Sequence, residues 1–278
     1  MLKYRLLVGF PMAAAALGLL LLDTGRDHPG LFVLVMLVAV ASVRELRYLI
    51  VPAVRPRVWL TTLGVLTVLV ANWTQAPSVF KPVAPSPWPA VLLTLTALML
   101  VAATREVLAY AGDGTSTGRL IGTVFALVYL GVLPSFLVQL VWLPVAGPWA
   151  VLATIFVPKV CDIGAYFTGR AFGRHPMAPT LSPKKTWEGF AGGLVASAGT
   201  AVGIGYAAPL FPHGPLEAAA FGVVVGTVGV LGDLFESLLK RDAQVKDASA
   251  AIPGYGGVLD VIDSILFAAP VAYLWFSL

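Results

Sequence analysis

Two short stretches near the carboxyl terminus could bind a metal ion, because each carries carboxylates at helical spacing between apolar segments. Asp233, Glu236 and Lys240 fall on one helix face, and Asp260 and Asp263 repeat the spacing of three residues. Two helices can therefore direct their acidic faces toward one another. Carboxylates combined with water and phosphate oxygens are the ligands with which proteins hold Mg²⁺. The alternative is a structural role in which nearby cations only neutralise the acids.

The segment that joins these two stretches is polar and rich in glycine. It ends in the turn Pro253–Gly257, with the sequence P-G-Y-G-G. Glycine permits positive φ angles and a close approach of the backbone to a ligand. Such a mixture of cations and acids suits a substrate with several negative charges. The charged residues of the segment are Arg241, Asp242, Lys246 and Asp247.

A further charged group precedes these stretches, inside an apolar run. Lys159 and Asp162 are three residues apart and share a helix face, and Arg170 follows where the run ends. A neutralising ion pair would explain the first two residues. Ionisable residues within a membrane span more often mark a functional site, and we favour that interpretation.

The segment Ser182–Gly189, with the sequence S-P-K-K-T-W-E-G, is another candidate. Ser-Pro is typical of a turn or a helix start. We therefore expect Lys184 and Lys185 at a helix amino terminus, which favours anions. With the Thr186 hydroxyl and free backbone amides, they would form a phosphate cradle. The alternative is the ordinary excess of basic residues on the inner side of a membrane protein.

Membrane-spanning helices must position all of these residues. The chain has 278 residues, 58% hydrophobic and 12% charged, whereas soluble proteins have about 25% charged residues. Long apolar runs without alternation disfavour a transmembrane β-barrel. We predict an all-α integral membrane protein, a polytopic bundle of about nine transmembrane helices, the first of them an uncleaved span. The predicted spans are 5–22, 31–50, 58–75, 89–109, 119–143, 149–168, 188–209, 216–238 and 258–277.

Two local features qualify this picture. The second apolar run is interrupted at Arg44–Glu45, and we expect Leu46–Val51 to form an amphipathic turn at the membrane interface. The single cysteine, Cys161, cannot form an intrachain disulfide.

The distribution of basic residues predicts the orientation. If the amino terminus is cytoplasmic, all but three of the 18 Lys and Arg residues fall on the cytoplasmic side. The exceptions are Arg26 and Lys81, in outer loops, and Lys159, within a span. We therefore expect the acidic faces and basic loops at the cytoplasmic surface of a bacterial-type inner membrane.

These motifs resemble the phosphatidate cytidylyltransferase family, also called CDP-diacylglycerol synthases. That family's signature is S-x-x-K-R-x(4)-K-D, then P-G-H-G-G, then x-x-D-R-x-D-S, and here it runs from Ser237 to Ser264. The segments Asp162–Arg170 and Ser182–Gly189 also match. Tyr255 stands where the family usually has His, and Val261 where it usually has Arg. These departures bear on substrate preference and rate more than on the reaction class.

The resemblance implies transfer of CMP from CTP to phosphatidate, giving CDP-diacylglycerol and pyrophosphate. The lipid phosphate would attack the α-phosphorus of CTP directly, and Asp233, Asp260 and Asp263 would bind Mg²⁺, with a second cation left open. From charge and position, we expect Lys184, Lys185, Lys240, Arg241 and Lys246 to hold phosphates. The remaining predicted substrate-binding residues are Asp162, Arg170, Ser182, Thr186, Glu188, Ser237, Asp247, Gly254, Tyr255, Gly256 and Gly257.

Two alternatives from different classes stay open at this point. One is a CTP-dependent polyprenol or phytol kinase, or another lipid cytidylyltransferase. The other is a cation-coupled transporter whose acids form an ion path. We expect residues 1–148 to be a scaffold with possible oligomer contacts and residues 149–278 to be the catalytic region. The expected partners are CTP, phosphatidate and the lipid bilayer; the resemblance suggests a homodimer, and no nucleic acid is expected.

Overall fold

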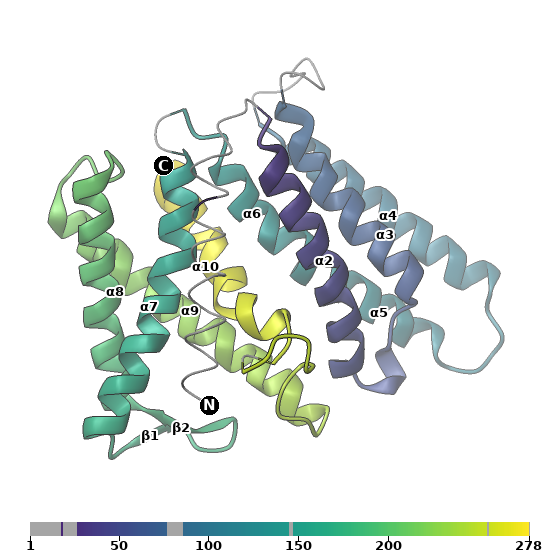
Figure 1. The fold of residues 1–278 in the computed structure, drawn as a ribbon. Helices are drawn as coiled ribbons and strands as arrows, with labels where there is room; N and C mark the ends of the chain where they lie inside the picture. The colour runs from purple at the N-terminus through teal and green to yellow at the C-terminus, as the bar shows by residue number, and fades with distance from the viewer. Residues whose placement is uncertain (1–17, 19–26, 77–85, 145–146, 255, 278) are drawn as a thin grey trace. The chain divides into compact units, whose positions relative to one another are not determined.

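The computed structural model describes residues 18, 27–76, 86–144, 147–254 and 256–277, and it is almost entirely helical (Figure 1). Eight helical segments are long and apolar enough to cross a membrane, which confirms eight of the predicted spans. The first predicted span, 5–22, lies outside the described residues apart from Gly18. The eight segments are Pro29–Leu49 (α2), Val58–Gln75 (α3 and η2), Trp88–Leu108 (α4), Ser116–Leu140 (α5, η3 and α6), Gly147–Phe172 (α7), Trp187–Ala207 (α8), Pro215–Asp242 (α9) and Leu259–Ser277 (α10).

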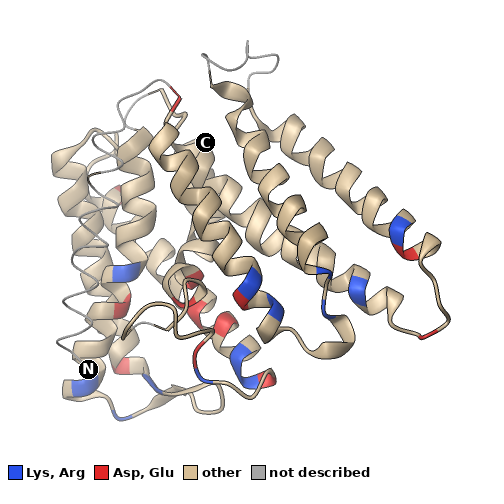
Figure 2. Cartoon of the chain, turned by 45° about the vertical axis from the view of Figure 1, so that its right-hand side comes forward, with Lys and Arg blue, Asp and Glu red and all other residues tan. Residues whose placement is uncertain are grey.

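The chain divides into two compact units. The first unit comprises Met1–Ser135 and Asp242–Val261, and the second comprises Phe136–Arg241 and Ile262–Leu278. The division follows compactness, so the functional division at residue 148 stays a prediction. Within each unit, the charged residues gather mainly toward one end of the helices (Figure 2).

In the first unit, helices α2 to α5 lie side by side (Figure 1). The short helix η1 (Pro52–Val54) packs its carbonyl groups against α5 (Ser116–Leu127). A Cβ atom at Gly122 would lie 1.9 Å from the Val54 oxygen, so only glycine permits this contact. Deeper in the unit, the Asn72 amide donates to the Ser135 hydroxyl at 2.8 Å, which satisfies two buried polar groups.

In the second unit, helices α7 and α8 pack closely through small residues. A Cβ atom at Gly164 would lie 2.7 Å from the Ala196 Cβ, and one at Gly193 would lie 2.7 Å from the Cys161 oxygen. Small residues let membrane helices approach this closely, since the gain comes from packing and not from exclusion of water. An antiparallel hairpin, β1 (Pro176–Ala178) and β2 (Ser182–Thr186), joins the two helices. Figure 1 shows it at one end of the pair.

The hairpin corrects one expectation from the sequence. Lys184 and Lys185 lie in β2, so the prediction that they sit at a helix amino terminus is wrong. Helix α8 begins only at Trp187, where the Thr186 hydroxyl caps it by accepting from the Gly189 amide at 3.1 Å. Ser-Pro is typical of a turn as well as of a helix start, and Pro183 fits a two-stranded hairpin because both strands of such a hairpin are edge strands.

Helix α2 corrects a second expectation from the sequence. It continues to Leu49 as a regular helix, and both Leu46 and Leu49 are buried. The predicted interfacial turn at Leu46–Val51 is therefore wrong over most of its length. The charges at Arg44–Glu45 interrupt the apolar run in the sequence, but Glu45 is also buried, at 6% exposure, because it has partners inside the first unit.

Candidate active site

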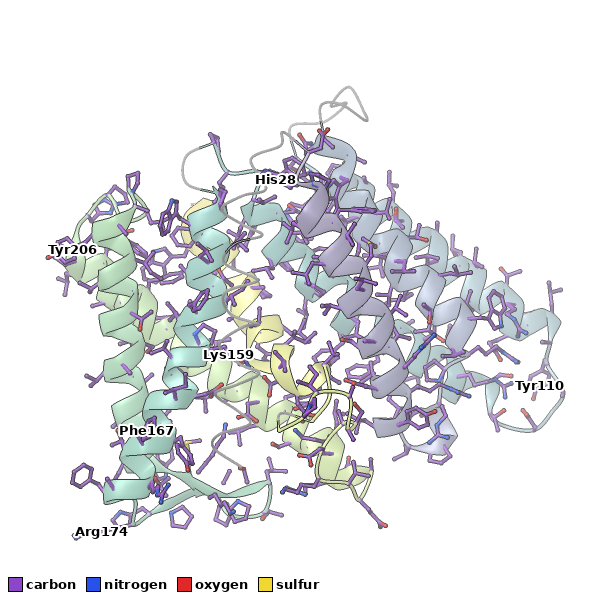
Figure 3. All side chains as sticks on the ribbon, in the orientation of Figure 1. His28, Tyr110, Lys159, Phe167, Arg174 and Tyr206 are labelled. Atoms are coloured by element: carbon purple, nitrogen blue, oxygen red, sulfur yellow. The ribbon has the colours of Figure 1, made fainter. Side chains whose placement is uncertain are left out.

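Two lysines and three aspartates form a group of opposite charges in the second unit. Lys159, on α7, places its Nζ 3.1 Å from Oδ1 of Asp263 on α10, and 4.0 Å from Oδ2 of Asp162 one turn further along its own helix. Figure 3 labels Lys159 part-way along α7, within the span. Asp263 is 4% exposed, so its carboxylate depends on this ammonium group and on the Ser264 amide, which donates to Oδ1 at 2.6 Å.

The other lysine of the group comes from the hairpin. Lys185 in β2 lies 2.6 Å, Nζ to Oδ2, from Asp233 on α9. Asp162 interacts electrostatically with Asp233, Asp263 and both lysines, so the two ion pairs belong together. We call these five residues the lysine–carboxylate cluster. By formal charge, its three carboxylates and two ammonium groups leave one negative charge in excess.

The geometry of the hairpin separates the two predicted phosphate-binding lysines. Side chains alternate between the faces of a strand, so Lys184 points away from the face on which Lys185 meets Asp233, and it is exposed. Glu188, a predicted substrate contact, accepts hydrogen bonds from the backbone amides of Arg174 and His175. Glu188 thereby connects the start of α8 to the end of α7, where Figure 3 labels Arg174.

The carboxyl-terminal end of α9 carries further predicted residues. Lys240 donates to Glu236 at 2.6 Å, and both side chains are buried, as their spacing of four on one helix face predicts. The Arg241 Nε donates to the Leu181 carbonyl at 3.2 Å, which ties this end of the helix to the hairpin turn. Ser237 is also buried, while Arg170 is exposed and donates to the Tyr166 hydroxyl.

The glycine-rich turn and Asp260 lie in the first unit. Oδ2 of Asp260 accepts hydrogen bonds from the Gly257 amide at 2.7 Å and the Ala248 amide at 2.9 Å. Gly254 and Gly256 have φ angles of 84° and 100°, which confirms the prediction of positive φ in this turn. Tyr255 lies outside the described residues. Lys246 and Asp247 are exposed in the loop before the turn.

Glu45 is a charged residue whose role the sequence did not reveal. Its carboxylate accepts from the Ser249 hydroxyl at 2.6 Å, the Val258 amide at 3.0 Å and the Leu259 amide at 2.7 Å. We call this set of contacts the Glu45 anchor. The only signal in the sequence was an acid at the end of an apolar run, and its partners lie more than 200 residues away.

A second acid of the first unit, Glu106, has a different environment. It is largely buried and accepts from Nε of Arg57 at 3.1 Å and Nε of Arg119 at 2.9 Å, with Arg105 at 3.6 Å. Nearby, hydrogen bonds from the Thr115 hydroxyl and amide lower the pKa of Asp113. Arginines that encircle one carboxylate form a structural junction between helices α3, α4 and α5.

The carboxylates fit a magnesium site in their chemistry. Among the described residues, no three His, Cys, Asp or Glu side chains converge closely enough to hold a metal ion by themselves. Mg²⁺ does not require such a cage, because it binds through one or two carboxylates with water and substrate phosphates as its other ligands. The excess negative charge of the lysine–carboxylate cluster would attract a cation.

Comparison with known proteins places the chain in a family. The model of the cytidylyltransferase family matches residues 3–278. The chain belongs to this family. The match extends over the whole described part of the chain, including the region before residue 150, where the motifs alone indicated no similarity.

Curated relatives carry a more specific name. A phosphatidate cytidylyltransferase of Mycobacterium tuberculosis is 41% identical over 156 residues, which is 56% of this chain and 47% of the relative. That of Haemophilus influenzae is 40% identical over 141 residues, 48% of each protein. Phosphatidate cytidylyltransferase 5, chloroplastic, of Arabidopsis thaliana is 36% identical over 178 residues, covering 56% of this chain and 44% of the relative. The matched regions span about half the length of these relatives.

The structure brings together part of the predicted site within each unit. In the second unit it joins Asp162, Lys185, Asp233 and Asp263, and adds Lys159, which the sequence placed beside Asp162. In the first unit it joins Asp260 to the glycine turn. Asp233 and Asp260 belong to different units, and their approach to one another stays a prediction.

Proposed function

We propose that this chain transfers CMP from CTP to phosphatidate, as the names of its relatives imply for them. A nonbridging oxygen of the lipid phosphate attacks the α-phosphorus of CTP. The bond from the α-phosphorus to the bridging oxygen breaks, and pyrophosphate leaves with that oxygen. No nucleophile from the protein takes part. The observation that carries the proposal is the lysine–carboxylate cluster, which membrane helices and the hairpin form together in a chain of the cytidylyltransferase family.

The cluster supports this chemistry because its ion pairs can exchange partners. Lys185 and Lys159 neutralise Asp233 and Asp263 at 2.6 and 3.1 Å. When a nucleotide and a cation arrive together, the ammonium groups can move to phosphate oxygens while the carboxylates move to the cation. Charge is conserved throughout the exchange, so no buried carboxylate is left alone. Phosphoryl chemistry depends mainly on such positioning and charge stabilisation.

In this proposal the metal would be Mg²⁺, and Asp233, Asp263 and Asp260 would be its protein ligands. When bound, it would neutralise charge on the phosphates and polarise the phosphorus that is attacked. Lys184, Lys240, Arg241 and Lys246 would contribute positive charge toward the two substrates. The predicted contacts from Gly254, Gly256 and Gly257 belong to the same proposal, since glycine lets a ligand approach the backbone closely.

We further propose that the site faces the cytoplasm of a bacterial-type inner membrane and that the protein forms a homodimer. CTP is made in the cytoplasm, so a cytoplasmic site gives it direct access. The distribution of Lys and Arg supports this orientation. The gathering of charges toward one end of the helices (Figure 2) favours an interfacial enzyme over a transporter, whose acids would be spread across the membrane.

The test is product analysis with purified protein in detergent or nanodiscs. We expect pyrophosphate and CDP-diacylglycerol from CTP and phosphatidate, with Mg²⁺ required. Release of CDP from CTP with a lipid alcohol would instead identify a kinase, and absence of CTP turnover with ion-coupled uptake would identify a transporter. The Tyr255→His variant, measured beside the natural protein, reports whether the departure from the family sequence changes the rate.

A further inference from the structure

We propose that Glu45 is a positioning residue of the reaction, which acts by fixing the amino end of helix α10 and so the carboxylate of Asp260. This inference rests on the proposed function, because it assigns Glu45 a place in the same site. It adds a residue outside every motif that the sequence analysis used. All of the contacts involved lie within the first unit.

The amino end of α10 requires an acceptor that its own sequence does not provide. The first amides of a helix have no partner inside the helix, and a Ser, Thr, Asp or Asn before the helix usually supplies one. Here the preceding residue is Val258, whose side chain has no acceptor. Glu45 supplies an acceptor from another helix, since its carboxylate accepts from the amides of both Val258 and Leu259. A carboxylate at this position also interacts favourably with the helix dipole.

A second acid, Asp260, binds the adjacent amides. Its Oδ2 accepts from Gly257 and Ala248, while Glu45 accepts from Val258 and Leu259. The consecutive amides from Gly257 to Leu259 are thus shared between two carboxylates. Glu45 therefore holds Val258 and Leu259, the two residues that directly precede Asp260, and so keeps Asp260 in a defined position.

The glycine at position 257 is required by Glu45. A Cβ atom there would lie 2.6 Å from Oε2 of Glu45 and 2.7 Å from its Cδ. Gly257 does not have a positive φ, so steric exclusion by the carboxylate, and not backbone conformation, explains this glycine. At Gly256 a Cβ atom would likewise lie 2.6 Å from a carboxylate oxygen, Oδ2 of Asp260, and its φ of 100° is a further constraint. A carboxylate therefore excludes a side chain at both glycines, and Gly256 also needs glycine for its backbone conformation.

The test combines two measurements on Glu45→Gln and Gly257→Ala in the full-length protein. The first is hydrogen–deuterium exchange of the peptide that contains Val258–Asp260, without metal or substrate. We expect faster exchange in both variants, because the Gln side chain puts a donor where an acceptor is needed and the Ala side chain displaces the carboxylate. The second is pyrophosphate release, for which we expect an approximately 10-fold to 100-fold loss of kcat, with KM for CTP changed less than about 3-fold.

The double variant Glu45→Ala/Gly257→Ala separates positioning from general damage. Removing the carboxylate makes room for the new Cβ, so Gly257→Ala should cost less than about 2-fold in the Glu45→Ala background although it costs much more alone. If the losses of activity from Glu45→Ala and Gly257→Ala were additive, a clash between the new Cβ at position 257 and the Glu45 carboxylate would not explain the effect of Gly257→Ala. Ser249→Ala provides a milder variant that removes one of the three hydrogen bonds, and it decides the matter if Glu45→Gln does not fold.

Each outcome bears on the proposal. If hydrogen–deuterium exchange of this peptide is unchanged in Glu45→Gln, Glu45 does not hold the start of α10. If the exchange is faster but pyrophosphate release is unchanged, Glu45 does not position Asp260 for the reaction. If the natural protein releases no pyrophosphate, the proposed function fails, while the exchange measurement still decides whether Glu45 holds this loop. Faster exchange, a loss confined to kcat and nonadditivity with Gly257→Ala would together support the proposal.

Discussion

The lysine–carboxylate cluster of the second unit and the Glu45 anchor of the first unit use carboxylates in opposite ways. In the cluster, Asp233 and Asp263 are held by lysine ammonium groups on long, flexible side chains. In the anchor, Glu45 is held mainly by backbone amides of a loop and a helix end. An ammonium group can change partners by rotating a side chain, whereas an amide can do so only if the backbone moves.

Carboxylates therefore serve two different purposes in this protein. Exchangeable carboxylates suit ligand binding, because a substrate phosphate and a cation can replace both members of an ion pair. Fixed carboxylates suit positioning, because several backbone donors determine where the chain runs. Asp260 combines the two, since one oxygen accepts from backbone amides and the residue is a proposed metal ligand.

The largest effect is expected for Asp260→Asn. The amide nitrogen cannot accept a hydrogen bond, and the loss of charge removes a proposed metal ligand, so turnover should fall by about 1,000-fold or more. The measurement is pyrophosphate release, with circular dichroism and membrane extraction to verify folding and insertion. Near-normal turnover in this variant would remove Asp260 from the metal role.

The next effect concerns Lys185. Lys185→Gln should lower kcat/KM for CTP by about 100-fold, because a charged hydrogen bond to phosphate and the partner of Asp233 are both lost. Lys185→Arg should retain most of the activity if the site needs a mobile cation. Lys184→Gln is the matched comparison on the opposite face of the strand, and we expect a loss at least about 10-fold smaller. Equal losses at both positions would contradict the exchange of partners at Lys185.

A smaller effect, on stability and not on substrate affinity, is expected for Glu106→Gln. It would leave three arginines around a neutral group, at a cost of about 2 kcal/mol. The measurement is thermal unfolding in detergent, alongside KM for CTP, which should stay within about 2-fold because Glu106 belongs to neither carboxylate site. His213→Gln, an exposed residue, is the control for both measurements. A large rise in KM would show that this junction is coupled to the site.

The smallest effect concerns Asp113, outside the spans. Because hydrogen bonds from Thr115 lower its pKa, they stabilise the folded state above the ordinary pKa of Asp, and this contribution is lost as the pH falls through the lowered value. Thr115→Val should raise the pKa of Asp113 toward the ordinary value and leave turnover at neutral pH unchanged. NMR titration of the Asp113 carboxyl carbon measures the shift. An unaltered titration would mean that Thr115 is not the cause.

The sequence predicted the spans well and the site in part, for physical reasons that particular residues illustrate. Apolar runs and helical spacing are local signals, so the eight described spans, the pair Lys159–Asp162 and the pair Glu236–Lys240 were all predictable. The strand at Lys184 and Lys185 was missed, because a hairpin this short depends on its partner strand more than on its own residues. Glu45 could not be assigned a role, since nothing near it in the chain identifies its partners.

The distance along the chain between Glu45 and its donors has a consequence for biogenesis. The donors are synthesised 204 to 214 residues after Glu45, which at about 5–20 residues per second is a delay of roughly 10–40 s. During that interval the nascent polypeptide carries an acid near the membrane with no native partner, which is costly unless the acid is hydrated or protonated. Completion of the last helix therefore gives the early one its final neighbours, and a chain that stops short of residue 249 lacks all three donors to the Glu45 carboxylate.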